Sequence, residues 1–461
     1  MKLLRFLDSL SAKSRRRFLL YLQSPYMNQK PILTRLYETL IEDRYTLNLD
    51  IDKKRLWNRS GTSEDFTDTR FRLRISEIYK HLEQFLALED FLQQGGKSDI
   101  SLLNRLRSLE LYEDFERKLT HSKQQIENSD RQDAAALSDR LTLMQMDYEH
   151  RKSLRLSEFN LQQYADLQEV VFISQKLRHA CLMLSHERLT KSSYDYGMTD
   201  HLLSYIQDRG LMQYPAIALY HHFYLLASGK ATDLYEEYQE LLFKHIDGFP
   251  LEEQQDFVIG AINYCIARIN RGEDAYSRHL LELYQEGIEN KILFTDGRLS
   301  RFTYRNAAAI GIKLNELTWV ANFIEDKKRF LDPRYADSIY RFNKARLLYH
   351  SSLHDQALDQ LYHTDYEDQI LSLAAQTLKM KIYYEQQEDA LLESFMDSTE
   401  KAVRRMTKLG YHRENYLKVL RYTRMVHRAY DRNSLEQIKE KINSEESLLE
   451  RRWLLERVEL K

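Results

Sequence analysis

The scarcity of glycine and proline is the feature of this 461-residue sequence that most limits how it can fold. The chain holds 13 glycines and 5 prolines, whereas average usage would place roughly 55 residues of these two types in a chain of this length. Glycine and proline interrupt helices and form tight turns, so we expect long helices joined by short polar corners. Alternating or β-branched runs long enough to build a sheet are also missing. The predicted fold class is therefore all-α.

The charge balance gives the whole chain no attraction to polyanions. The sequence has 68 Lys and Arg residues against 70 Asp and Glu residues, a net charge of -2, and so carries no global field toward nucleic acid or an anionic membrane. No apolar run approaches the roughly 20 residues that a transmembrane helix needs. Arg5 and Asp8 interrupt what would be the core of a signal peptide. We therefore expect a soluble, cytoplasmic protein with no membrane partner, and the oligomeric state stays open.

Apolar periodicity and one glycine pair divide the chain into four regions. Gly95 and Gly96 are the only adjacent glycines, and they follow a helix expected from about 68 to 93. Strands are expected nowhere. The predicted regions are an N-terminal helical domain at 1–95, a connecting region at 96–210 with long helices at about 101–127, 133–153 and 160–190, helical hairpins at 211–410, and a basic helix with a C-terminal capping helix (434–458) at 411–461.

The third region has a repeat period. Its helices are expected in pairs, and the first helix of each pair begins near 214, 251, 297, 335 and 368, so the starts recur every 33 to 46 residues. A period in this range is typical of a helical solenoid, in which each hairpin buries its apolar face only by stacking on its neighbours.

The clearest unit spans 335–396. Ala345 and Ala357 stand 12 residues apart among large apolar side chains, and the phrase DQAL (355–358) returns as EDAL (388–391). This pattern resembles the tetratricopeptide repeat, in which small residues at the helix crossings are surrounded by large aromatic side chains.

The resemblance implies that a right-handed α-solenoid of tetratricopeptide-like hairpins follows the N-terminal domain and ends in the capping helix. The layout also resembles an uncharacterised bacterial family of all-helical proteins, which implies no activity. The phrases that carry this second resemblance are FLLYLQSPYMN (18–28), LTWVANFIED (317–326) and YRFNKARLLYH (340–350).

Motifs for catalysis are missing from the sequence. Gly96, Lys97 and Ser98 could end a phosphate-binding loop, but Phe91 stands where that motif needs a glycine. No H-E-x-x-H zinc motif occurs, and the paired carboxylates have basic neighbours, as solvated helix faces do. We therefore predict no catalytic residue, cofactor or metal ligand, and do not expect an enzyme.

The charge is unevenly distributed near the C-terminus. Residues 401–432 hold ten Lys and Arg residues and two acidic residues, whereas 351–400 hold eleven acidic residues and two lysines. At helical spacing, five basic residues are expected to form one stripe. This basic stripe comprises Lys418, Arg421, Arg424, Arg428 and Arg432. Three interpretations remain open: the stripe neutralises the acidic segment, binds an acidic partner segment, or binds the phosphates of a nucleic acid.

A second basic cluster lies near the N-terminus on a helix expected over 11–23. It comprises Lys13, Arg15, Arg16 and Arg17. Successive residues of a helix point in different directions, so these side chains cannot form a single clamp, and a solvated face is favoured over a binding site.

The sequence predicts a non-enzymatic protein–protein interaction scaffold, whose groove, formed by the first helices of the pairs from about 214 to 410, holds a peptide or helix of a partner. The alternative is a nucleic-acid or ribonucleoprotein-associated protein that uses the basic stripe. The net charge of -2 and the missing nucleic-acid motifs do not favour this alternative.

Overall fold

Helices make up nearly all the regular structure of the computed structural model, which confirms the predicted all-α class. The model describes residues 2–62, 64–93, 95–156, 158–190, 192–231, 233–362, 368–406 and 412–461. The chain divides into two compact units, with the boundary between Lys176 and Leu177. Within the described ranges, no helix is long and apolar enough to span a bilayer.

Unit 1 contains eight helices and the first half of a ninth. Their bounds are α1 (Lys2–Ser9), α2 (Ala12–Gln23), α3 (Pro31–Ile41), the π-helical turn η1 (Glu42–Thr46), α4 (Lys53–Arg59), α5 (Asp68–Gln93), α6 (Gly95–Ser108), α7 (Tyr112–Glu127), α8 (Ala134–Ser153) and α9 (Leu161–Thr190).

Local signals set several of these helix starts. The Ser11 hydroxyl accepts a hydrogen bond from the Ser14 backbone N–H and caps α2, and Pro31 occupies the first turn of α3, where its missing N–H costs nothing. Gly95 and Gly96 are the first two residues of α6, so the glycine pair lies at the start of a helix and does not form a linker. The buried apolar clusters on the two sides of this pair are separate: one joins α1 to α5, and the other joins α6 to α8.

Unit 2 consists of the rest of α9 and the helices that follow. Their bounds are α10 (Thr199–Asp208), η2 (Leu211–Gln213), α11 (Pro215–Ser228), α12 (Tyr235–His245), η3 (Ile246–Gly248), α13 (Leu251–Ile269), α14 (Tyr276–Glu289), α15 (Arg301–Lys313), α16 (Leu317–Lys327), η4 (Lys328–Phe330), α17 (Ala336–His350), α18 (His354–Tyr362), α19 (Gln369–Glu385), α20 (Asp389–Arg405), α21 (His412–Arg428), α22 (Arg432–Ser444) and α23 (Arg451–Glu459), with the short strands β1 (Phe294–Thr295) and β2 (Arg298–Leu299).

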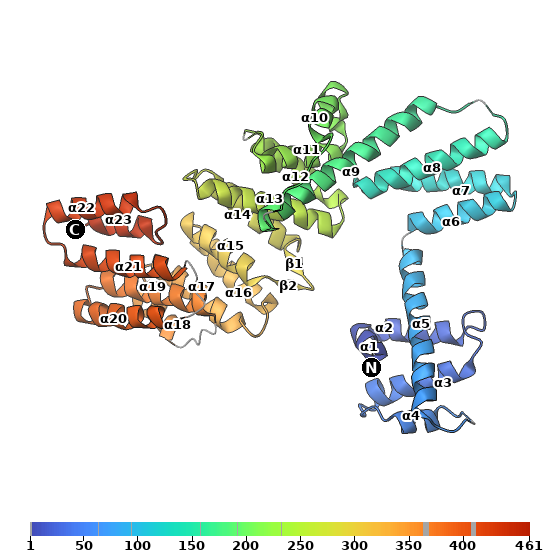
Figure 1. Ribbon diagram of the computed structural model, residues 1–461, viewed down its shortest axis with the longest axis horizontal. Coiled ribbons are helices and arrows are strands. Elements are labelled where there is room, and N and C mark those ends of the chain that lie inside the picture. The colour runs from blue at the N-terminus through green and yellow to red at the C-terminus, as the bar shows by residue number, and fades with distance from the viewer. Residues whose placement is uncertain are drawn as a thin grey trace. The chain divides into compact units, whose positions relative to one another are not determined.

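The helices from α11 to α20 form five consecutive pairs, whose first helices are α11, α13, α15, α17 and α19. Each pair packs internally, and α15 contacts α17 while α17 contacts α19. In Figure 1 the yellow to orange helices α15 to α20 follow one another in chain order. Contacts between sequence neighbours are those that a stack of helical hairpins makes. The right-handed superhelix stays a prediction.

Small residues lie where paired helices approach most closely. Ala345 on α17 and Ala357 on α18 are both fully buried. On α15, a Cβ added to Gly311 would lie 2.5 Å from a methyl group of Val320 on α16, and 3.0 Å from the ring of Trp319. Ala390, the counterpart of Ala357 in the repeated phrase, is exposed in the first turn of α20. The expected crossing residue is therefore confirmed in one hairpin and wrong in the next.

Several helices end without glycine. Ser352, Gln387 and Asn315 adopt the left-handed backbone region, with φ of 59°, 59° and 60°. After each of them, a backbone N–H returns to a carbonyl five residues earlier, for example Glu388 to Tyr383 at 3.1 Å. These are Schellman motifs, in which glycine is the usual left-handed residue. The chain therefore forms tight helix ends with non-glycine residues, for which the left-handed backbone conformation costs free energy.

The expectation that strands are missing is wrong at one place. Strands β1 and β2 pair antiparallel, with Phe294 opposite Leu299. The turn between them is Asp296-Gly297, with φ of 51° and 73°. An Asp-Gly pair favours this two-residue hairpin turn, because both positions need positive φ. The hairpin delays the start of α15 from the expected 297 to Arg301.

Two helices expected to be continuous are each broken in two. In place of the helix expected over 101–127, the structure has α6 and α7. The break lies at Glu110, which takes φ of 58°, and the Leu111 N–H donates to the Leu106 carbonyl. The capping helix expected over 434–458 is the pair α22 and α23, and Glu450, with φ of 56°, precedes α23. Neither break contains the glycine or proline that would mark it in the sequence.

The C-terminal pair is anchored through one carboxylate. Glu385 at the end of α19 accepts hydrogen bonds from the Tyr349 hydroxyl at 2.6 Å and from the Trp453 indole N–H at 2.7 Å. Lys381, one turn earlier, forms an ion pair with Glu450 at 2.9 Å. These bonds attach α23 to α17 and α19, so the chain's last helix packs on the final pair of the array.

We predict that Gly311→Ala lowers the free energy of unfolding by about 1–3 kcal/mol, because the new methyl group overlaps the stiff side chain of Val320. Chemical denaturation followed by circular dichroism measures this change. Val320→Ala provides the control: the double variant should be more stable than the two single effects added together predict. Strictly additive losses would contradict the proposed overlap.

We also predict that Gln387→Gly stabilises the protein by about 0.5–1 kcal/mol, because glycine adopts the left-handed conformation at the end of α19 without a steric cost. Gln437→Gly is the matched control. Gln437 is exposed within α22, where glycine should cost about 1 kcal/mol. Thermal denaturation of both variants tests the prediction, which fails if the two changes have the same sign.

Candidate functional site

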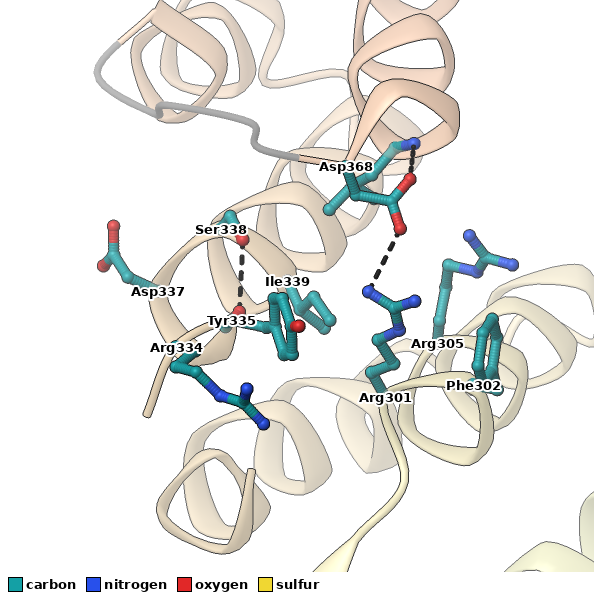
Figure 2. Close-up of a pocket in the computed structure, with 10 residues that line it drawn as sticks. Arg301, Phe302, Arg305, Arg334, Tyr335, Asp337, Ser338, Ile339 and Asp368 are labelled. Atoms are coloured by element: carbon teal, nitrogen blue, oxygen red, sulfur yellow. Dashed lines mark hydrogen bonds and ion pairs between the residues drawn. The ribbon is translucent and has the colours of Figure 1, made fainter. Parts of the chain in front are cut away.

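A pocket of about 160 Å³ lies on the first helices of three consecutive pairs. Its wall is formed by the start of α15, by the turn before α17 with the first turn of α17, and by the start of α19 (Figure 2). The lining residues are Arg301, Phe302, Arg305, Arg334, Tyr335, Asp337, Ser338, Ile339, Asp368 and Leu371. The pocket therefore brings three arginines, two aspartates and two aromatic rings together.

Asp368 joins α15 to α19 across the pocket. Its carboxylate caps α19 by accepting the backbone N–H groups of Ile370 and Leu371, at 2.9 and 3.1 Å. Its second oxygen lies 3.1 Å from Nη1 of Arg301, and Figure 2 shows this arginine directed at the aspartate. The Arg301 guanidinium also lies 4.9 Å from the centre of the Tyr335 ring. Arg301 is thus held by a carboxylate and an aromatic face.

Arg334 also has a carboxylate partner. It pairs with Asp332 at 2.7 Å, and the hydrogen bonds from Arg334 hold the pKa of that carboxyl well below its ordinary value. Arg298 pairs with the same aspartate at 3.2 Å. Asp337 bonds to Arg341 on its own helix, at 2.9 Å, and Figure 2 shows it directed away from Arg301 and Arg305.

Arg305 differs from the other two arginines. It is half-buried one turn after Arg301, and its guanidinium lies 5.9 Å from the Phe302 ring. Among the described residues, no carboxylate lies within ion-pair distance of it. Burial is the main cause that lowers the pKa of Arg346 on α17; the carboxylate of Glu450 opposes this shift, and the positive charge of Arg305 adds a smaller lowering.

Guanidinium groups recognise planar or tetrahedral oxyanions through paired hydrogen bonds. A pocket that contains such a group beside aromatic faces can hold an anionic group and an apolar neighbour of that group. Its volume is below the roughly 300–1,000 Å³ of ordinary small-molecule sites. The geometry is therefore better suited to a single side chain than to a cofactor.

The structure places four residues of the basic stripe on α21, where each faces a carboxylate of the same unit. Lys418 and Arg421 share Glu445, at 2.5 and 3.0 Å. Arg428 pairs with Glu393 of α20 at 2.9 Å. The hydrogen bond from Lys418 is the largest cause that holds the pKa of Glu445 below its ordinary value.

Arg424 is the centre of this network. It lies 2.8 Å from Asp397 and 3.1 Å from Glu400, both on α20. Arg432, the fifth residue of the stripe, begins α22 and is exposed. The contacts with α20 agree with the interpretation that the stripe neutralises the acidic segment. Residues 363–367 of that segment and 407–411 of the basic segment lie outside the described residues.

The second basic cluster points in several directions along α2, as expected. Arg15 donates to the Leu7 carbonyl at 3.0 Å and lies 4.0 Å from the Tyr45 ring. Arg17 pairs with Glu89 at 2.7 Å. Lys13 and Arg16 are exposed.

Sequence reasoning missed the arginines of the pocket. The signal that could have found them is positional: Arg301 and Arg334 occur at the starts of two consecutive first helices, and Asp368 occurs at the start of a third. No group of three His, Cys, Asp or Glu side chains in the described ranges could hold a metal ion.

We predict that Arg424→Gln lowers the free energy of unfolding by about 1 kcal/mol at low ionic strength, because it removes the shared partner of the α20 carboxylates. Denaturation in low and high salt measures the change, which salt should reduce by screening. Arg432→Gln is the control and should leave stability within a few tenths of a kcal/mol. Equal losses in the two variants would show that the network does not stabilise the fold.

Comparison with known proteins assigns no family to the chain. No protein-family model matches it, and neither a curated protein nor a solved structure is significantly similar to it. The tetratricopeptide-like character of the hairpins stays a prediction, and the function is argued from the geometry alone.

Proposed function

We propose that this protein is a non-enzymatic scaffold that binds a segment of a partner protein along the first-helix face of unit 2. One observation carries the proposal: every residue that lines the pocket belongs to the first helix of one of three consecutive pairs or to the turn that leads into it. The first helices α15, α17 and α19 contact one another in sequence, and stacked helical repeats use such surfaces for binding.

The surface beside the pocket has the composition of a binding site. Phe302 is 54% exposed on α15, and Ile370 is 37% exposed in the first turn of α19. Large apolar side chains exposed next to arginines are typical of the central contacts of protein interfaces. Both side chains would be covered by a segment that lies across the pocket.

The alternative, nucleic-acid association through the basic stripe, is less well supported. Arg424 and Arg428 contact carboxylates of α20, and Lys418 and Arg421 share Glu445. A phosphate backbone would have to replace these partners. We therefore favour a protein partner over a nucleic acid.

The test uses the full chain with a photoreactive phenylalanine analogue in place of Phe302, produced in cells that normally make the protein. Phe243 is the matched control, because it is also exposed, at 37%, but lies on the second helix α12. We expect illumination to join a discrete protein to position 302 and not to position 243, with the partner identified by mass spectrometry. Identical products at both positions, or none at 302, would contradict the proposal.

A further inference from the structure

The charges around the pocket are not balanced on the first-helix face. Arg301 and Arg334 have carboxylate partners at 3.1 and 2.7 Å. For Arg305, in contrast, the described residues offer no carboxylate within ion-pair distance, and its guanidinium lies 5.9 Å from the centre of the Phe302 ring. Among the pocket-lining arginines of the described chain, Arg305 is therefore the one without an ion-pair partner.

The Arg305 side chain is half-buried, so its guanidinium has lost part of its hydration without forming an ion pair with a described residue. Such a charge is unfavourable until a counter-ion arrives. An incoming anion would supply the missing partner of Arg305.

The pocket wall distinguishes between kinds of anion. Arg301 and Arg334 already have carboxylate partners, so the pocket offers an anion one unpaired guanidinium, whereas the binding surfaces for the closely spaced phosphates of a nucleic acid are strongly positive. An acidic side chain brings one charge on a narrow stem, which fits a pocket of about 160 Å³. The rings of Phe302 and Tyr335 offer an apolar surface for a neighbouring residue.

We infer that Arg305 binds the carboxylate of an Asp or Glu side chain in an acidic peptide segment of the partner, and that an apolar residue of the same segment packs on Phe302 and Tyr335. This inference rests on the proposed function, since it specifies the chemistry of the segment on the first-helix face. The basic stripe is not part of this site.

The experiment selects a phage-displayed random dodecapeptide library on the full chain. The selected peptides are then labelled with fluorescein, and their affinities are measured by anisotropy. We expect Asp and Glu to be enriched, next to an aromatic or aliphatic residue. Arg305→Glu should weaken binding by about tenfold or more, as expected for the loss of a charged hydrogen-bonded pair, and Arg305→Gln should weaken it less. Higher salt should weaken binding to the wild-type chain.

Arg329→Glu is the charge-matched control. Arg329 is exposed on η4 and does not line the pocket, so its reversal should change affinity less than twofold. Circular dichroism confirms that each variant is folded, and Arg305→Gln keeps the test decisive if Arg305→Glu unfolds.

Two outcomes would overturn the inference without affecting the proposed function. In the first, the selected peptides crosslink to the photoreactive analogue at position 302 but are not enriched in Asp or Glu. In the second, the selected peptides bind Arg305→Glu as tightly as they bind the wild-type chain. Arg305-dependent binding of a short single-stranded DNA, with no acidic peptide selected, would also overturn it. If no selected peptide crosslinks through position 302, the proposed function fails as well.

Discussion

Close contact between paired helices is the constraint on which unit 2 depends. A helical hairpin in a stack has no core of its own, so its two helices must approach closely and then bury their remaining apolar surface against the next pair. The contact of Gly311 with Val320 and the complete burial of Ala345 and Ala357 show where this approach occurs. The first helices α15, α17 and α19 consequently lie beside one another, and the pocket forms where these three begin.

The shortage of glycine has a structural consequence beyond the abundance of helix. Helices still have to end, and here they end through residues such as Ser352 and Gln387 in the left-handed region. The Schellman hydrogen bonds satisfy the last carbonyls, while the side chain adds a steric cost that glycine would avoid. The chain thus has sharp corners between helices and little flexible loop, which places its exposed functional groups on helix surfaces.

The arginines of unit 2 fall into two electrostatic classes. Those of the basic stripe on α21 face carboxylates of α20 or of the segment before α23, and they stabilise the packing of consecutive helices. Arg305 lies on the first-helix face without such a partner among the described residues. This difference, more than the number of basic residues in a segment, separates the proposed binding site from the structural network.

The sequence by itself determined the all-α class and most helix starts, because apolar periodicity, Ser11 and Pro31 act within one or two turns of chain. It did not reveal the breaks at Glu110 and Glu450, because glutamate is a common helix residue and its type does not indicate a left-handed backbone conformation. The sequence also indicated the basic stripe, because its residues lie close together along the chain. Only the tertiary structure decided which charges are paired: the packing of α15 near the start of α19 brings Arg301 to Asp368, whereas Arg305, one turn after Arg301, has no carboxylate partner among the described residues.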